Sequence, residues 1–257
     1  MSFYFSYLGS KRLDIKFYKD FLVMPEHINI IVEPFCGSSA TSYYMYKTLG
    51  FKKSYHINDI DVLLIKFINT VRKKGGIKYF MNKTKDATYN NKEEWLSHCN
   101  NPVYGYFYKQ LVRAQHGMCP LPGRFKRDPS QNERLLAFDK FYLRDRLKVT
   151  NEDYKNIFKL YVNNKNAFIF LDPPYLDSNN LDYTTYADSG GFGICVDNTK
   201  IYIDILDFLK VAKCRVLLII NKLAIIDLIF KDYVKGEYDK IYSNTQKKTK
   251  HLIVANY

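Results

Sequence analysis

The chain has 257 residues, enough to bury the core of one domain or of one domain that carries a sizeable insertion. Hydrophobic residues make up 47% of it and aromatic residues 16%, which argues against a disordered chain. The formal net charge is +13, with Lys and Arg spread along the sequence. This charge favours a polyanionic partner such as nucleic acid, although a solvated lysine-rich surface is the other reading.

The first quarter of the chain predicts two strand–turn–helix units. The apolar, β-branched run 28–32 breaks at Glu33-Pro34 into small residues, after which 41–49 has helical spacing. A second apolar run, 54–57, ends at the sequence NDID and leads into 62–71, whose apolar residues again recur at helical spacing.

The pattern changes between residues 75 and 149. Gly75-Gly76 opens this stretch, the β-branched runs vanish, and polar, aromatic and basic residues take over. We expect a small, mostly helical inserted subdomain over 75–149, with the catalytic domain formed by 1–74 and 150–257.

After the insertion, strands and helices alternate again. Thr150 is the expected N-cap of a helix that has Glu152 and Asp153 in its first turn. Three elements follow: a strand at 167–171, a helix near 199–211 and a strand at 215–220. The alternation predicts an α/β fold with parallel strands, and the segment 251–257 predicts a closing strand paired with 239–242 as an antiparallel edge hairpin.

The five cysteines are odd in number and show no CxxC pair, so the sequence favours neither a disulfide framework nor a zinc site. They are Cys36, Cys99, Cys119, Cys195 and Cys214. No window approaches the roughly 20 apolar residues of a membrane span. We therefore expect an intracellular protein, in the cytoplasm or nucleoid, that is neither secreted nor membrane-embedded and needs no metal.

Two strand ends suggest a nucleoside cofactor. In EPFCGSSA, at 33–40, small residues lead from a strand into a helix, where free N–H groups and the positive dipole end favour a ligand. Asp59 of NDID follows the second strand at about the 20-residue spacing at which an acid binds ribose hydroxyls in nucleotide-binding folds. The alternative is that Ser38, Ser39 and Asp59 only cap helices.

The sequence DPPY, residues 172–175, points to an amine substrate. Each proline fixes its own φ and keeps the preceding residue extended, so Asp172 and Pro173 are held beyond the strand. The Asp172 carboxylate and the Pro173 carbonyl then offer two acceptors to one planar –NH2 group, with the Tyr175 ring as a stacking surface.

An amine conjugated to a ring is a poor nucleophile, and two acceptors stabilise the positive charge that grows on it during attack. A methyl sulfonium is the matching electrophile. The alternative is an ordinary strand-ending Pro-Pro turn.

With these motifs in this order, the sequence resembles the Dam-like family of α-type, DPPY-containing adenine-N6-specific DNA methyltransferases. The resemblance covers essentially the whole chain. It implies a Rossmann-like sheet, S-adenosyl-L-methionine as cofactor, and methyl transfer to the exocyclic N6 amine of an adenine flipped out of duplex DNA. Methylation of RNA adenine or of a protein glutamine, and a catalytically silent DNA-binding accessory protein, are the alternatives.

The resemblance also assigns residues. SYLGSKR at 6–12 is similar to the family's opening motif, and the glycine turn has Ser39 where a second glycine is frequent. The implied cofactor-binding residues are Tyr7, Gly9, Lys11, Phe35, Gly37, Asp59 and Asp172, and the implied catalytic residues are Asp172, Pro173, Pro174 and Tyr175. The segment 182–192 is similar to the family's loop over the site, which brings Tyr183 or Tyr186 to substrate or cofactor or into aromatic packing.

The segment 107–130 resembles the family's DNA-recognition segment. Arginine contacts phosphates or a guanine edge, and an aromatic residue at a loop tip can wedge into a base stack. The candidate DNA-binding residues are Lys109, Arg113, Arg124, Phe125, Lys126 and Arg127. The expected partners are double-stranded DNA and a cognate restriction endonuclease that acts on the same site, with the protein a monomer or weak dimer.

Overall fold

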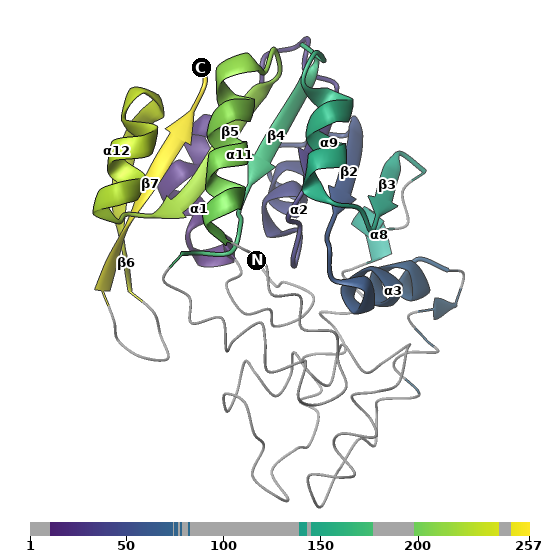
Figure 1. Ribbon diagram of the computed structural model, residues 1–257. Coiled ribbons are helices and arrows are strands. Elements are labelled where there is room, and N and C mark those ends of the chain that lie inside the picture. Colours follow the sequence, from purple (N-terminus) through teal and green to yellow (C-terminus); the bar gives the residue numbers. More distant parts are fainter. Residues whose placement is uncertain are drawn as a thin grey trace, which may run out of the picture.

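A seven-stranded sheet forms the centre of the protein (Figure 1). The structure, a computed structural model, describes residues 11–73, 75, 76, 78, 82, 139–142, 145–176, 198–241 and 248–257. The strand order is β3-β2-β1-β4-β5-β7-β6. The strands are β1 (Ile30–Glu33), β2 (Ser54–Asn58), β3 (Leu147–Thr150), β4 (Ala167–Leu171), β5 (Arg215–Asn221), β6 (Val234–Ile241) and β7 (Lys248–Ala255).

The first five strands are parallel, and β7 pairs antiparallel with both β5 and β6. This confirms the predicted α/β sheet with an antiparallel hairpin at one edge, but not the predicted pairing of 251–257 with 239–242: residues 239–241 pair with 248–250, and 251–254 pair with 234–238. β7 lies inside the sheet, between β5 and β6, because its five C-terminal residues are buried whereas β6 alternates between exposed and more buried positions.

Helices cover both faces of the sheet. One face carries α1 (Ile15–Tyr18), α2 (Ala40–Lys47), α3 (Val62–Val71) and α8 (Asp139–Tyr142), with the short 3₁₀ helices η1 (Lys11–Leu13) and η2 (Lys19–Leu22) beside them. The other face carries α9 (Tyr154–Tyr161), α11 (Asn198–Val211) and α12 (Ala224–Phe230), and the 3₁₀ helix η3 (Lys231–Tyr233) follows α12. In Figure 1, α9 and α11 lie in front of the sheet and α1 and α2 behind it.

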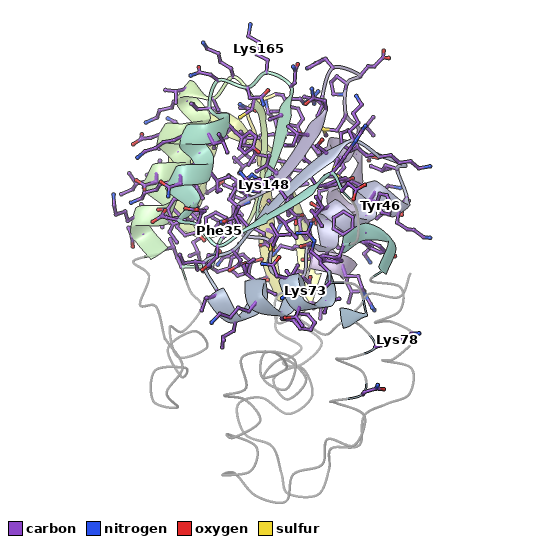
Figure 2. The ribbon with its side chains drawn as sticks, turned by 90° about the vertical axis from the view of Figure 1, so that its right-hand side faces the viewer. Phe35, Tyr46, Lys73, Lys78, Lys148 and Lys165 are labelled. Atoms are coloured by element: carbon purple, nitrogen blue, oxygen red, sulfur yellow. The ribbon has the colours of Figure 1, made fainter. Side chains whose placement is uncertain are left out.

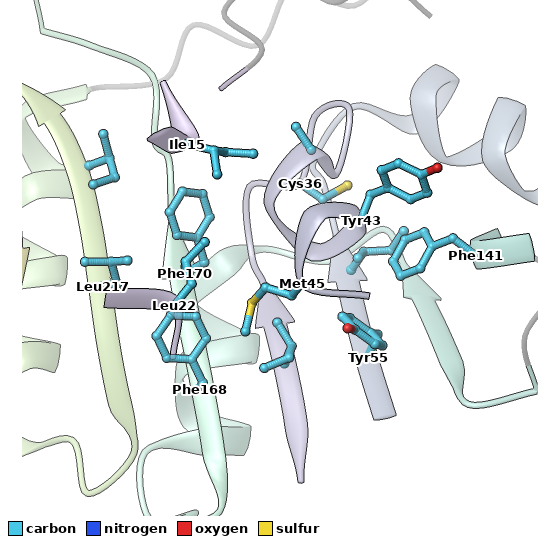
Figure 3. Close-up of a cluster of buried hydrophobic side chains, with 14 of the residues drawn as sticks. Ile15, Leu22, Cys36, Tyr43, Met45, Tyr55, Phe141, Phe168, Phe170 and Leu217 are labelled. Carbon is cyan, nitrogen blue, oxygen red and sulfur yellow. The ribbon is translucent and has the colours of Figure 1, made fainter. Parts of the chain in front are cut away.

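The β4 sequence AFIFL shows why both faces are covered. All five residues are buried, and because side chains alternate across a strand, Phe168 and Phe170 pack on the α1–α2 side (Figure 3). Ala167, Ile169 and Leu171 pack on the α9–α11 side. A strand that is apolar at every position suits a parallel sheet between two helical layers.

The expectation for Thr150 is wrong. Thr150 ends β3, which pairs in parallel with β2, and α9 begins only at Tyr154 with Asp153 as its N-cap. The Asp153 carboxylate accepts a hydrogen bond from the backbone N–H of Lys155 at 2.8 Å. The division of the chain into catalytic domain and insertion stays a prediction, but the end that we expected at residue 149 falls inside β3.

Asn58 joins three strand ends through its side chain. Its Nδ2 donates to the carbonyls of Pro34 (3.0 Å) and Glu152 (2.9 Å). Its Oδ1 accepts from the Thr150 hydroxyl (2.7 Å) and the Glu152 backbone N–H (2.9 Å). Four bonds are the most that a side-chain amide with two donor hydrogens and two acceptor lone pairs forms.

Replacing Asn58 with Ala should therefore lower the free energy of unfolding by about 3 kcal/mol, because the buried Pro34 carbonyl and three part-buried groups lose their hydrogen bonds to the amide. Urea unfolding of the two proteins measures this loss. The control is Asn156→Ala, which removes an exposed amide that donates to Glu152 and should change stability by less than about 0.5 kcal/mol. Equal stabilities for both variants would show that Asn58 does not hold the strand ends together.

No helix in the described ranges is long and apolar enough to span a bilayer. Within the same residues, no group of three or more His, Cys, Asp or Glu side chains is arranged to hold a metal ion.

Candidate active site

The strand order reverses direction between β1 and β4. From β1 the chain runs outward through β2 and β3, and then returns to β4 on the other side of β1. In open α/β sheets, ligands bind at such a reversal, outside the C-terminal ends of the strands. The glycine turn follows β1 and the DPPY sequence follows β4, so the topology brings both predicted motifs to this one crevice.

Asp172 lies at the end of β4, and its main contact is with Lys11. The Lys11 Nζ atom is 2.5 Å from Asp172 Oδ1 and also donates to the Tyr175 hydroxyl. The Lys11 side chain is only 3% exposed, whereas that of Asp172 is 21% exposed. An almost fully buried lysine therefore meets the carboxylate from the side of the sheet that carries α1.

Burial is the main influence on the charge of this pair. It raises the pKa of the Asp172 carboxyl, and the nearby Lys11 cation opposes that rise. Burial also lowers the pKa of the Lys11 amine, and Asp172 opposes that change. Each charge thus limits the shift that burial imposes on the other, and the contact with Lys11 favours the carboxylate form of Asp172, which accepts hydrogen bonds.

The two prolines are fixed from the opposite side of the sheet. Tyr202 of α11 donates its hydroxyl to the Pro174 carbonyl at 2.6 Å. Pro173 is buried, and Tyr175 is half-buried with its ring edge-on to His251 at 5.4 Å between centroids. Sequence reasoning missed Tyr202 because its position within an amphipathic helix resembles that of any core aromatic residue.

The glycine turn has two residues in left-handed conformation, Gly37 (φ 45°) and Ser39 (φ 50°). Ser39 occupies the N-cap position of α2 but makes no side-chain capping hydrogen bond. A left-handed φ at a residue other than glycine costs roughly 1–2 kcal/mol. The backbone therefore takes a shape suited to glycine even where Ser39 replaces the family's second glycine.

Asp59 ties this turn to the end of β2. Its Oδ2 accepts from the Gly37 N–H at 2.9 Å and its Oδ1 from the Asp61 N–H at 3.0 Å. Burial, followed by the charge of Asp61, raises the pKa of Asp59 to about 6. The N-cap of α3 is Asp61, which accepts from Leu63 and Leu64, so the capping alternative for Asp59 is wrong.

Phe35 lies toward the C-terminal ends of the strands, whereas Lys165, which precedes β4, lies at the other end (Figure 2). The Phe35 ring packs against that of Tyr154 on α9, with 5.2 Å between centroids. Gly37 and Asp59 lie together, but Phe35 packs with α9, so its cofactor contact stays a prediction.

Several predicted site residues lie outside the described residues: Tyr7, Gly9, Lys109, Arg113, Arg124, Phe125, Lys126, Arg127, Tyr183 and Tyr186.

Comparison with known proteins decides the family. The family described as D12 class N6 adenine-specific DNA methyltransferase matches residues 7–194, which include the glycine turn, Asp59 and the DPPY sequence. The chain belongs to this family. It is a DNA adenine methyltransferase that uses S-adenosylmethionine, as the sequence predicts.

The methyltransferase is also similar to individual proteins. It shares 24% identity with the Type II methyltransferase M.CviBI of Paramecium bursaria Chlorella virus NC1A, over 97% of each chain. A putative class I S-adenosylmethionine-dependent methyltransferase of Listeria monocytogenes matches at 11% identity and a TM-score of 0.40, over 95% of this chain and 58% of that protein. The delta-N METTL16 methyltransferase domain matches at 12% identity and a TM-score of 0.38, over 96% and 82%.

Glu33 is a further residue of this site that sequence reasoning missed. It ends β1 and is 2% exposed. Its Oε1 accepts the backbone N–H of Ser42 in the first turn of α2 at 2.9 Å. Its Oε2 is buried and has no hydrogen-bond partner among the residues that the structure describes.

The position of Glu33 suits a cationic group of the cofactor. Ile31 packs on the α1–α2 side, so Glu33, two residues further along the strand, faces that side, from which Lys11 reaches Asp172. Burial raises the pKa of Glu33 to about 8, and the charge of Asp172 contributes to this rise. A buried carboxyl with a spare acceptor atom fits the amino group of S-adenosylmethionine, and the acid within IIVEPF was the signal that could have revealed it.

Proposed function

We propose that Asp172 and the Pro173 carbonyl accept hydrogen bonds from the N6 amine of an adenine flipped out of duplex DNA, and that Tyr175 stacks on the base. The observation that supports this most is the Lys11–Asp172 contact at the sheet reversal. Because Lys11 favours the carboxylate form of Asp172 and the side chain is partly exposed, Asp172 is an acceptor that an incoming amine can reach.

The cofactor supplies an electrophilic methyl group on a sulfonium when it is bound. For this chain we propose that Asp59 binds the ribose hydroxyls and Glu33 the methionine amino group, while the Gly37 turn allows close approach of the backbone. The support is that Gly37 and Asp59 are hydrogen-bonded to each other and that Glu33 has a spare acceptor atom. Tyr7, Gly9, Lys11 and Phe35 remain candidates from the sequence.

Removing the adenine from the base stack costs a few kcal/mol. Stacking on Tyr175 offsets part of this cost, since base–aromatic contacts contribute about 1–3 kcal/mol. Basic side chains on the flanking phosphates supply more binding energy, and we propose that the recognition segment 107–130 provides them.

The name of the viral relative, a Type II methyltransferase, supports a restriction endonuclease as partner for this chain. Incubating the purified protein with labelled S-adenosylmethionine and either duplex DNA or RNA tests the function. We expect label in adenine N6 of DNA, whereas label in RNA alone would contradict the proposal.

Binding to duplex DNA should depend strongly on salt. The variant Arg124→Ala is expected to weaken binding, and if Arg124 contacts a phosphate it should reduce the slope of log K against log salt concentration by about one. Fluorescence anisotropy at several salt concentrations measures this slope. The control is Lys165→Ala, at the end of the sheet away from the site. If Arg124→Ala bound DNA with unchanged affinity, Arg124 would not be part of the DNA interface.

A further inference from the structure

A second buried ion pair lies next to Lys11. The Lys240 Nζ atom on β6 is 2.6 Å from Asp14 Oδ2, and the two side chains are 11% and 5% exposed. By contrast, Lys250 and Glu237, which pair across β6 and β7, are 55% and 38% exposed. Replacing a buried ion pair with apolar residues is often neutral or stabilising, so stability alone is a weak reason for the Asp14–Lys240 pair.

The backbone connects Asp14 directly to Lys11. Lys11–Leu13 forms η1, and the Asp14 N–H donates to the Lys11 carbonyl at 2.9 Å. Residues i and i+3 lie on the same side of a 3₁₀ helix, so Lys11 and Asp14 project in the same general direction. When Lys240 fixes Asp14, it also fixes the turn from which Lys11 reaches Asp172.

The β6–β7 hairpin, which carries Lys240, also contacts the site through aromatic rings. The Phe17 ring of α1 stacks on Tyr238 of β6, with 4.7 Å between centroids and 12° between planes. Tyr238 is hydrogen-bonded through its hydroxyl to His251 Nδ1 on β7 at 3.4 Å, and the His251 ring meets the Tyr175 ring. The β6–β7 hairpin therefore contacts both the N-terminal turn and the DPPY sequence.

We propose that Asp14 and Lys240 are positioning residues for methyl transfer, because their ion pair fixes the turn that places Lys11 against Asp172. This inference rests on the proposed role of Asp172 as the acceptor for the amine. Neither positioning residue needs to touch substrate or cofactor, since both act through Lys11.

Among the described residues, the charged and titratable groups around Lys11 are Asp172 and Tyr175 after β4, Asp14 before α1, Lys240 on β6 and His251 on β7. Glu33 at the end of β1 and Tyr18 of α1 also interact with the charge of Asp172, and no variant of the test changes either of them. Asp14 raises the pKa of Asp172 and Lys240 lowers it, so removing both charges together largely cancels their direct effects. Any remaining change in the titration of Asp172 then reports its contact with Lys11. Loss of that contact should raise the pKa of Asp172.

The test compares Lys240→Met, Lys240→Arg and the double variant Asp14→Asn/Lys240→Met, with Lys250→Met as control. We expect Lys240→Met to lower kcat about 10- to 100-fold, as a displaced catalytic group does, and to move the acid limb of the kcat–pH profile to higher pH. Lys240→Arg and Lys250→Met should keep the wild-type kcat and profile.

The double variant separates positioning from stability. It leaves no unpaired buried charge, so its Tm should recover relative to Lys240→Met, and it remains measurable if that single variant fails to fold. We expect its kcat to stay low and its acid limb to stay shifted. If kcat and the profile recover together with Tm, the ion pair is only structural and the inference is wrong.

The variant Asp172→Ala separates failure of this inference from failure of the proposed function. If Asp172→Ala is inactive while Lys240→Met has normal kcat and profile, the inference is wrong but the proposed role of Asp172 stands. If Asp172→Ala is active, the proposed role of Asp172 is wrong.

Discussion

The variant Asp172→Ala is expected to lose methyl transfer to DNA, with kcat lower by about 10²–10³-fold or more, because it removes an acceptor that stabilises charge developing in the transition state. The carboxylate lies at the sheet reversal with Lys11 at 2.5 Å, and removing it also leaves that buried cation without its nearest counter-ion. Single-turnover incorporation of labelled methyl into duplex DNA measures the rate of the chemical step.

The matched control is Asp207→Ala on α11, which removes a 66% exposed aspartate that pairs only with an exposed lysine in the described structure. Its rate should equal that of the unchanged protein. A rate for Asp172→Ala within tenfold of the control would mean that the acceptor lies elsewhere.

The variant Glu33→Gln should have opposite effects on cofactor binding and stability. We expect its affinity for S-adenosylmethionine to fall about 10- to 100-fold, because a buried hydrogen bond between two charged groups is replaced by a weaker neutral one. Isothermal titration calorimetry measures this affinity without any need for turnover.

The stability of the cofactor-free protein should depend on pH through the same residue. The pKa of Glu33 rises from an ordinary value of 4.5 to about 8 on folding, so between these values the folded state binds more protons than the unfolded state. The contribution of Glu33 to stability therefore declines as pH rises from 4.5 through 8. Because the glutamine side chain of the Glu33→Gln variant does not titrate, the variant should gain Tm relative to the original protein as pH rises through this window.

Glu26→Gln makes the same substitution at an exposed position and serves as control. It should change neither the affinity nor the pH dependence of Tm. If Glu33→Gln bound the cofactor normally but showed the expected stability gain, the carboxyl would be a buried group without a role in binding. Normal binding together with an unchanged pH profile would contradict its burial as well.

The sequence predicted the central elements well because each has one dominant signal. The run AFIFL is apolar at all five positions, and the structure has β4 at Ala167–Leu171 as predicted. The helical spacing of 62–71 corresponds to α3 at Val62–Val71. The C-terminal hairpin was also predicted, since two strand-like segments follow each other across a short polar turn.

The errors occurred where several polar residues compete for one role. Thr150, Glu152 and Asp153 lie within four residues, and each matches the composition of a helix start. The structure selects Asp153 because the Thr150 hydroxyl is engaged by the buried Asn58 amide. Asp59 and Asp61 present the same ambiguity, which the hydrogen bond from Gly37 to Asp59 resolves.

The site could be predicted from sequence only where local motifs carry it. DPPY and NDID each lie within four residues, and the family resemblance added Lys11. Asp14 and Lys240 are separated by 226 residues and belong to no motif, so only the folded chain shows that they meet. For Glu33 the sequence offers a signal, an acid at the end of an apolar strand, but its burial and its spare oxygen are seen only in the folded chain.

The place of β7 between β5 and β6 affects the order in which the chain can fold during its synthesis on the ribosome. Asp172 and Lys11 have both been synthesised by the time β5 emerges, but Lys240 and His251 have not, and β5 still lacks its antiparallel neighbour. A nascent chain at that stage exposes the open edge of β5. It also lacks the Asp14–Lys240 ion pair that positions Lys11. Methylation competence should therefore arise late in translation, when the hairpin closes over that edge.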